Sequence, residues 1–378
     1  MPMPSSQRFL ALDIMRGITI ALMIFVNFPG SWSHIASHCE HAAWIGLTPP
    51  DFVFPFFLFM IGTSMSFSFK KFEQVSKMSA FLQILKRGSL LFIIGFLIHA
   101  FPFFQAPISE WRVMGVLQRI GLCYVIAGAL ILWFRTAGLL IFSAALLVLY
   151  YDILQVSHHP YDLLGNIVGI FDTSVLGTNH LWDRTNSFDP EGILSSLPAV
   201  VNIIMGFFAG NILKKNLMLE FKINRIAVCG LISLLIGLIV CIFVPISKNL
   251  WTPSFVLITS GAAFLVLFLL VWIIDIQGYK AWAKPFEIYG TNALFAYCIA
   301  ELWAQTLCYV IKIGDLDGYA WIYQKIFLPL EHFINPFLDP IGYTCNKWLA
   351  SEFFAITHVI VFFAILYPLY KFKIFIKI

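Results

Sequence analysis

Ten stretches of the chain are apolar and long enough to cross a bilayer as helices. A spanning helix needs about 20 predominantly apolar residues, and such stretches recur along the chain between polar segments. The predicted spans are residues 10–28, 52–69, 81–104, 113–134, 137–152, 192–213, 224–245, 254–274, 285–311 and 350–370. The pattern therefore predicts an all-α polytopic membrane protein, with one transmembrane domain over residues 1–378.

The distribution of positive charge orients these spans. Loops on the cytoplasmic side of a membrane carry an excess of lysine and arginine. If the N-terminus is cytoplasmic, most of the 24 lysines and arginines fall on that side, in alternate connections. We therefore expect both termini to be cytoplasmic. The long loops at residues 153–190 and 312–349 would lie on the far side, where together with residues 29–51 they would roof a pocket.

Composition agrees with burial in lipid and narrows the range of functions. The chain is 60% hydrophobic and 12% charged, whereas soluble domains are about 45–50% apolar and about 25% charged. The net charge of +4 comes without a cluster of basic residues, so no nucleic-acid partner is expected. The seven cysteines form no CxxC pair, a pattern that favours buried free thiols over a disulfide framework.

Two arginines stand where lipid makes charge costly. A charged side chain at mid-bilayer costs roughly 2.5–3.5 kcal/mol on insertion scales, so such residues are functional candidates. Arg112 and Arg119 are seven residues apart and would share one face of a helix, while Gly115 and Gly121 would let a ligand or a second helix approach closely. Each arginine either contacts phosphate or carbonyl oxygen in a polar cavity, or it forms an intramembrane ion pair or extends its charged end to the membrane surface.

The first span carries a polar stripe. Arg16 and Asn27 are eleven residues apart, so both lie on one face, with about 16 Å between them along the helix axis. This stripe would join the cytoplasmic entrance to the far surface. Ordinary roles are the alternative: Asp13 caps the first turn, Arg16 obeys the positive-inside rule, and Asn27 bonds a neighbouring helix.

Histidines gather after the first span. His34 and His38 are four residues apart, and Glu40 or His41 would complete a zinc site if the segment were helical. The segment reads as a loop, however. The sequence also shows no second group of polar residues that would hydrogen-bond to the ligands and orient them, so no metal is predicted. The capping-box sequence Thr-Pro-Pro-Asp, which ends at Asp51, marks the start of the second span.

Short motifs recur over nearly the whole chain. They are residues 13–17 (DIMRG), 25–27 (FVN), 41–48 (HAAWIGLT), Asp51 with 53–55 (VFP), 115–121 (GVLQRIG), 189–192 (DPEG), 248–251 (KNLW) and 292–294 (NAL). In this order they resemble the heparan-α-glucosaminide N-acetyltransferase family of membrane acyltransferases, which includes bacterial members.

The resemblance implies an enzyme that acetylates a glucosamine-type sugar on the periplasmic side of a bacterial inner membrane, using cytoplasmic acetyl-CoA. It also implies a homodimer. The family's active histidine maps onto His41 and its partner asparagine onto Asn27. We expect acceptor contacts from Trp44, Asp51, Glu191, Lys248, Asn249, Trp251, Asn292 and Glu301. We expect acetyl-CoA contacts from Asp13, Arg16, Lys71, Arg87, Gln118 and Arg119.

Elementary chemistry agrees with this expectation. CoA is polyanionic and cannot cross a bilayer, so the acetyl group must be handed across. The imidazole of His41 can take the proton of the amine near neutral pH. Asn27 would orient that ring or donate to the thioester oxygen, and transfer is either direct or through an acetyl-imidazole.

Two other classes of function stay open at this point. One is a transporter or flippase for a sugar or a lipid-linked precursor, which intramembrane Arg119 and Asn292 and broken helices would suit. The other is a structural membrane partner, which would leave the charged residues inside the spans unexplained.

Overall fold

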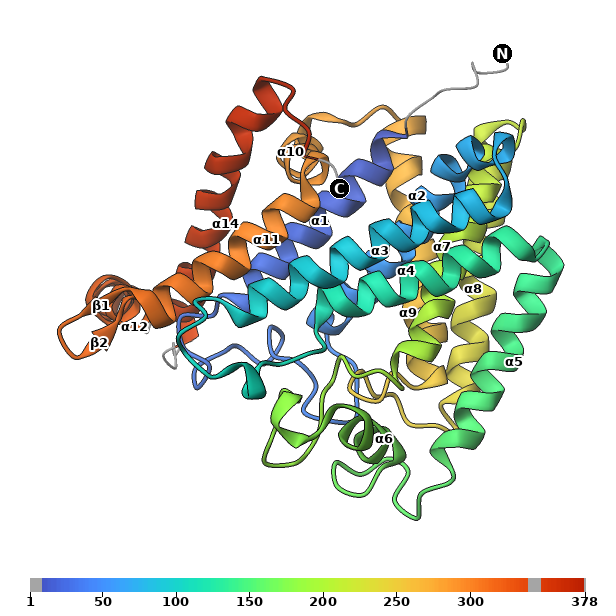
Figure 1. Cartoon of the computed structure of the whole chain (residues 1–378). Coiled ribbons are helices and arrows are strands. Elements are labelled where there is room, and N and C mark those ends of the chain that lie inside the picture. The colour runs from blue at the N-terminus through green and yellow to red at the C-terminus, as the bar shows by residue number, and fades with distance from the viewer. Residues whose placement is uncertain (1–8, 339–347, 377–378) are drawn as a thin grey trace.

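The computed structural model describes residues 9–338 and 348–376 and is almost entirely helical (Figure 1). Within these residues ten helical segments are long and apolar enough to span a membrane, which confirms the predicted count. Their helices are α1 (Leu10–Asn27), α2 (Val53–Ser68), α3 (Lys77–Ala100), α4 (Val116–Trp133), α5 (Thr136–Leu154), α7 (Ser196–Lys214), α8 (Leu219–Val240), α9 (Pro253–Leu270), α11 (Ala293–Gln305) and α14 (Trp348–Lys371).

Shorter elements join these helices. They are α6 (Ile167–Leu176), α10 (Lys284–Thr291), α12 (Gly318–Ile322), α13 (Leu328–Leu338) and the two-stranded hairpin of β1 (Lys312–Ile313) and β2 (Leu316–Asp317). Short 3-10 turns lie at Pro49–Phe52, Phe69–Gln74, Ile108–Glu110, Thr178–His180 and Ala281–Ala283, and π-helical turns at Val271–Ile276, Thr306–Val310 and Tyr323–Phe327. Figure 1 shows α6 and its loops at the bottom of the view, beyond the ends of the long helices.

Facing glycines bring the long helices into close pairs. A Cβ atom on Gly62 of α2 would lie 1.7 Å from the Ile203 carbonyl oxygen of α7, and one on Gly206 would lie 1.8 Å from that of Phe59. The same reciprocal contact joins α1 to α10 (Gly17 and Gly290), α3 to α4 (Gly88 and Gly121) and α8 to α9 (Gly230 and Gly261). Lipid provides no hydrophobic force between helices, so such close backbone packing holds the bundle together.

Two predicted spans differ from the structure. Helix α4 begins at Val116, so Arg112 precedes it, and the prediction that Arg112 and Arg119 share a helical face is wrong. Ion pairing explains the difference, because Arg112 is drawn to carboxylates of the loop before α7. The span predicted at residues 285–311 is broken at Asn292, whose amide instead bonds the backbone of Ile374 and Ile376.

Candidate active site

One cavity of about 1220 Å³ runs between α1, α2, α4 and the junction of α10 with α11. Its lining follows α1 from Arg16 to Asn27 and follows α2 in the opposite direction. A helix rises 1.5 Å per residue, so the cavity extends along roughly 16 Å of α1. We call its two limits the Arg16 end and the His41 end. The cavity exceeds the roughly 300–1,000 Å³ of an ordinary small-molecule pocket, so a large ligand or two ligands fit it.

At the His41 end, a helix cap holds a histidine. The Asp51 carboxylate accepts hydrogen bonds through Oδ2 from the Thr48 backbone N–H at 2.9 Å, the Thr48 hydroxyl at 2.8 Å and the Ala42 backbone N–H at 3.3 Å. Its other oxygen, Oδ1, lies 2.7 Å from His41 Nδ1. The Asp51 side chain is fully buried, whereas that of His41 is 36% exposed.

This pairing fixes the chemistry of the imidazole. An ionised carboxylate only accepts hydrogen bonds, so Nδ1 of His41 is protonated and donates a hydrogen bond to Asp51. The other ring nitrogen, Nε2, is then the one that can accept a proton. His41 lines the cavity, so this base is available to a bound molecule.

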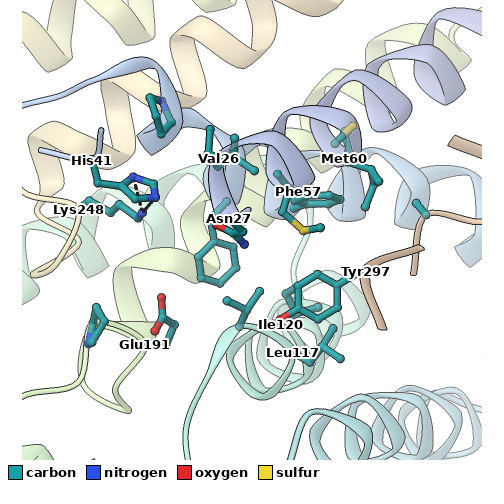
Figure 2. A pocket seen from close by; sticks show the side chains of 18 of the residues that line it. Val26, Asn27, His41, Phe57, Met60, Leu117, Ile120, Glu191, Lys248 and Tyr297 are labelled. Carbon is teal, nitrogen blue, oxygen red and sulfur yellow. Dashed lines mark hydrogen bonds between the residues drawn. The ribbon is translucent and has the colours of Figure 1, made fainter. Parts of the chain in front are cut away.

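Lys248 and Glu191 join His41 from two other loops. Lys248 Nζ lies 3.1 and 3.5 Å from the two ring nitrogens of His41 and 3.6 Å from Asp51 Oδ1. Burial lowers the pKa of Lys248, although the neighbouring carboxylates of Asp51 and Glu191 oppose that change. Figure 2 shows His41, Lys248 and Glu191 facing the same space, with Asn27 of α1 beyond them. The histidine therefore contacts the Asp51 carboxylate, ten residues later in the chain, and the Lys248 amine, 207 residues later.

A buried ion cluster positions Glu191. Arg112 donates to both oxygens of Asp189, at 2.9 and 2.6 Å, and to Glu191 Oε2 at 2.6 Å. Burial alone would raise the pKa of Glu191, but Arg112, Arg119 and Lys248 hold that pKa below its usual value. Glu191 therefore stays ionised at the cavity wall. The ion-pair alternative for Arg112 is confirmed.

Arginines line the opposite end of the cavity. Arg16 donates to the Ser64 hydroxyl of α2 at 3.0 Å and to Asp13 Oδ1 at 3.0 Å. Arg87 of α3 also lines the cavity and lies over the Tyr124 ring, 5.4 Å from its centroid. Between the two ends the lining is apolar and includes Ile20, Met23, Phe57, Ile61, Leu117 and Ile120. The cavity is thus polar at both ends and apolar in its middle.

Of the sixteen residues predicted for the site, nine line this cavity. They are Arg16, Asn27, His41, Trp44, Arg87, Glu191, Lys248, Asn249 and Asn292. The residues that do not line it are Asp13, Asp51, Lys71, Gln118, Arg119, Trp251 and Glu301. Asn292, expected beside the acceptor, instead lies near Arg16, because Gly290 packs against Asp13 of α1.

Arg119 does not line the cavity; its side chain bonds to other parts of the protein instead. Its side chain is fully buried and donates to the Gly192 carbonyl at 3.1 Å and to the Ser195 hydroxyl. Its guanidinium lies over the Trp251 ring, 4.9 Å from the centroid. Arg119 therefore ties α4 to the turn before α7.

Several lining residues were missed by the sequence analysis. Ser64 and Ser68 face the Arg16 end, and Trp182 faces the His41 end. The Asp183 backbone pairs with Phe188, which brings that loop to the cavity. The contact of Asp51 with His41 was also missed, because a capping box already accounted for the aspartate.

Comparisons of the sequence with a protein-family model and with curated proteins point to the same family. The family model for heparan-alpha-glucosaminide N-acetyltransferase, catalytic, matches residues 8–241. The heparan-alpha-glucosaminide N-acetyltransferase of Mus musculus is 28% identical over 375 residues, which cover 82% of this chain and 56% of the relative. That of Homo sapiens is 29% identical over 372 residues, with 82% and 55% covered. The chain thus spans about half the length of these curated relatives.

Proposed function

Because the chain belongs to the heparan-α-glucosaminide N-acetyltransferase catalytic family, as the motifs predicted, we propose that it is a membrane N-acetyltransferase. It would move acetyl from acetyl-CoA to the amine of a glucosamine-type sugar. One observation carries this proposal: a single cavity joins Arg16 and Arg87 to the His41–Asp51 pair.

The Arg16 end suits the donor. Arginines bind phosphate oxygens through charge-assisted hydrogen bonds, and Arg16 and Arg87 supply such groups at the cavity wall. The apolar middle would take the pantetheine arm and bring the thioester to Asn27. We place this end on the cytoplasmic side of a bacterial inner membrane, since the positive-inside rule puts the basic connections there.

The His41 end suits the acceptor and the reaction. The amine of the sugar would attack the thioester carbonyl carbon, and the carbon–sulfur bond would break. Nε2 of His41 would take the amine proton and return it to the leaving sulfur, while Asp51 would stabilise the transient imidazolium. The Asn27 amide would donate to the carbonyl oxygen as negative charge develops.

The lining of the His41 end also fits an amino sugar. Glu191 and Asp183 offer carboxylates to a cationic or hydroxylated ligand, and Trp44 and Trp182 offer ring faces to a sugar. Lys248 would keep the local charge near neutral, so that the amine can lose its proton. A homodimer, implied by the family resemblance, completes the proposal.

Release of free thiol from acetyl-CoA tests this function. We expect purified protein in detergent to release thiol only when glucosamine or a related amino sugar is present. His41→Ala should abolish release while leaving CoA binding intact, and Arg16→Ala should weaken CoA binding. The matched control is His159→Ala, because His159 forms an exposed pair with Asp162 outside the cavity. Full activity in His41→Ala would refute the role of His41.

The same experiment separates two chemical routes. If Nε2 of His41 attacks the thioester itself, an acetyl-imidazole forms and one equivalent of CoA appears before sugar is added. Direct transfer gives no such burst. The transporter alternative draws support from the break at Asn292 and from the continuous cavity. Sugar uptake into proteoliposomes without acetyl-CoA would favour it.

A further inference from the structure

Three potential metal ligands converge beside the rim of the cavity. His38 and Cys39 lie in the loop between α1 and α2, and Glu352 lies in the first turns of α14. His38 Nε2 is 3.5 Å from Glu352 Oε1, and Cys39 Sγ is 3.7 Å from the same oxygen. The three ligand atoms all lie within 4.8 Å of one another. Residues 313 positions apart in the chain therefore meet at one point.

These separations fit a tetrahedral zinc ion. With zinc–nitrogen and zinc–oxygen bonds of about 2.0–2.1 Å and a zinc–sulfur bond of about 2.3 Å, ligand atoms at tetrahedral corners lie roughly 3.3–3.6 Å apart. Two of the separations are already near that range. The exposed His38 side chain, at 69% relative accessibility, can rotate to close the third.

The first residues of the loop that carries His38 and Cys39 are hydrogen-bonded to α14. The Gly30 N–H donates to the Ser351 carbonyl at 3.3 Å, and the Ser31 N–H donates to the Ser351 hydroxyl at 3.2 Å. Ser351 immediately precedes Glu352, so the loop and α14 are joined beside the ligands. A metal would therefore bridge two segments that already contact each other.

We propose that His38, Cys39 and Glu352 form a binding site for zinc or a metal of similar softness. Thiolate and imidazole ligands select such metals over magnesium and calcium. Three protein ligands leave the fourth position to water or to an oxygen of a molecule in the cavity, and Cys39 itself lines that cavity. The site is distinct from the His41–Asp51 pair and does not depend on the transferase reaction.

Metal binding would release one proton from Cys39. A free cysteine thiol, with an ordinary pKa of about 8.5, carries its proton at neutral pH. Formation of the metal–sulfur bond would release that proton to solvent. The earlier alternative of His34 and Glu40 as ligands is not supported, because His34 Nδ1 lies near the Ser31 hydroxyl and the cluster contains neither residue.

Cobalt titration of the full chain tests the site. The protein, free of any polyhistidine tag and stripped with chelator, should bind one equivalent of Co²⁺ with tetrahedral and thiolate-to-cobalt absorption that Zn²⁺ removes. Cys39→Ser should abolish the thiolate band and weaken binding by at least tenfold, and Glu352→Gln should weaken it similarly. Cys308→Ser is the matched control, because Cys308 is also a half-buried free thiol but lies outside the cluster.

A second measurement guards against misfolded variants. The exposed His38 can be changed to alanine with little risk to the fold, and Zn²⁺ should raise the melting temperature of the wild type but not of His38→Ala. Absence of cobalt binding, or binding that Cys39→Ser and His38→Ala leave unchanged, would overturn the proposal.

Discussion

Replacing Asp51 by asparagine removes the carboxylate charge beside His41 and changes which ring nitrogen carries the proton, with almost no change in side-chain volume. The carboxylate accepts four hydrogen bonds: three at Oδ2, from the backbone N–H groups of Ala42 and Thr48 and from the Thr48 hydroxyl, and one at Oδ1 from His41. Asparagine has one oxygen and one NH₂ group. If the oxygen keeps the three cap bonds, the NH₂ group faces Nδ1 of His41. That nitrogen must then accept, and the proton moves to Nε2, which can no longer act as a base.

The magnitude follows from this reversal of the tautomer. The same aspartate-to-asparagine change in a serine protease triad lowers kcat by about 10⁴. A proton shuttle positioned in the transition state contributes about 10²–10⁴. We therefore expect kcat of Asp51→Asn to fall by roughly 10²–10⁴, or about 3–5 kcal/mol. Stability should fall by only about 1–2 kcal/mol, the usual cost of a weakened cap.

The assay is sugar-dependent thiol release from acetyl-CoA, with the melting temperature measured in parallel. Asp162→Asn is the control, since it alters another histidine–aspartate pair, 3.0 Å apart and largely exposed. A wild-type kcat in folded Asp51→Asn would contradict the reasoning. So would an equal loss in Asp162→Asn.

Two further predictions concern packing and buried charge, each measured by thermal unfolding in detergent. Asp189→Ala leaves the buried guanidinium of Arg112 without its bidentate partner and should lower the free energy of unfolding by about 3–5 kcal/mol. The control is Arg184→Ala, which breaks the exposed pair with Glu110 and should cost at most about 1 kcal/mol. Equal losses in the two variants would argue against the buried cluster. Gly62→Ala forces a Cβ atom against the α7 backbone and should destabilise by at least about 1–3 kcal/mol. Gly138→Ala, on the partly exposed α5, should be tolerated or stabilising, so similar losses at both glycines would refute the close-packing argument.

The spans could be predicted from sequence because hydropathy is a local property. Each stretch of about 20 apolar residues forms a helix in lipid regardless of its neighbours. The break at Asn292 escaped prediction, because it depends on the segment around Ile374 and Ile376, 82 and 84 residues later. The start of α4 escaped for the same reason, since Arg112 pairs with Asp189, 77 residues away.

Many residues of the candidate site could be predicted from the sequence, but the contacts between them could not. Nine predicted residues line one cavity, yet nothing in the sequence places Lys248 against His41, 207 positions earlier. Asp51 shows the limit most clearly. Its capping role follows from residues 48–51 alone, whereas its contact with His41 depends on how the preceding loop folds back over the cap. Arg119 shows the reverse case, because its intramembrane charge made it a candidate for a ligand contact, whereas the structure places its guanidinium over the Trp251 ring and outside the cavity lining.

The apolar middle of the cavity has an electrical consequence. A passage between the two faces of an energised membrane invites leakage, since moving one elementary charge through 100 mV is worth about 2.3 kcal/mol. Hydrophobic constrictions oppose such currents by excluding water and hydrated ions. Side chains such as Ile20, Phe57 and Leu117 give the middle of this cavity an apolar lining of the same kind. Under the proposed function, a bound pantetheine arm would fill this apolar part of the cavity, and the same side chains would disfavour hydrated ions there.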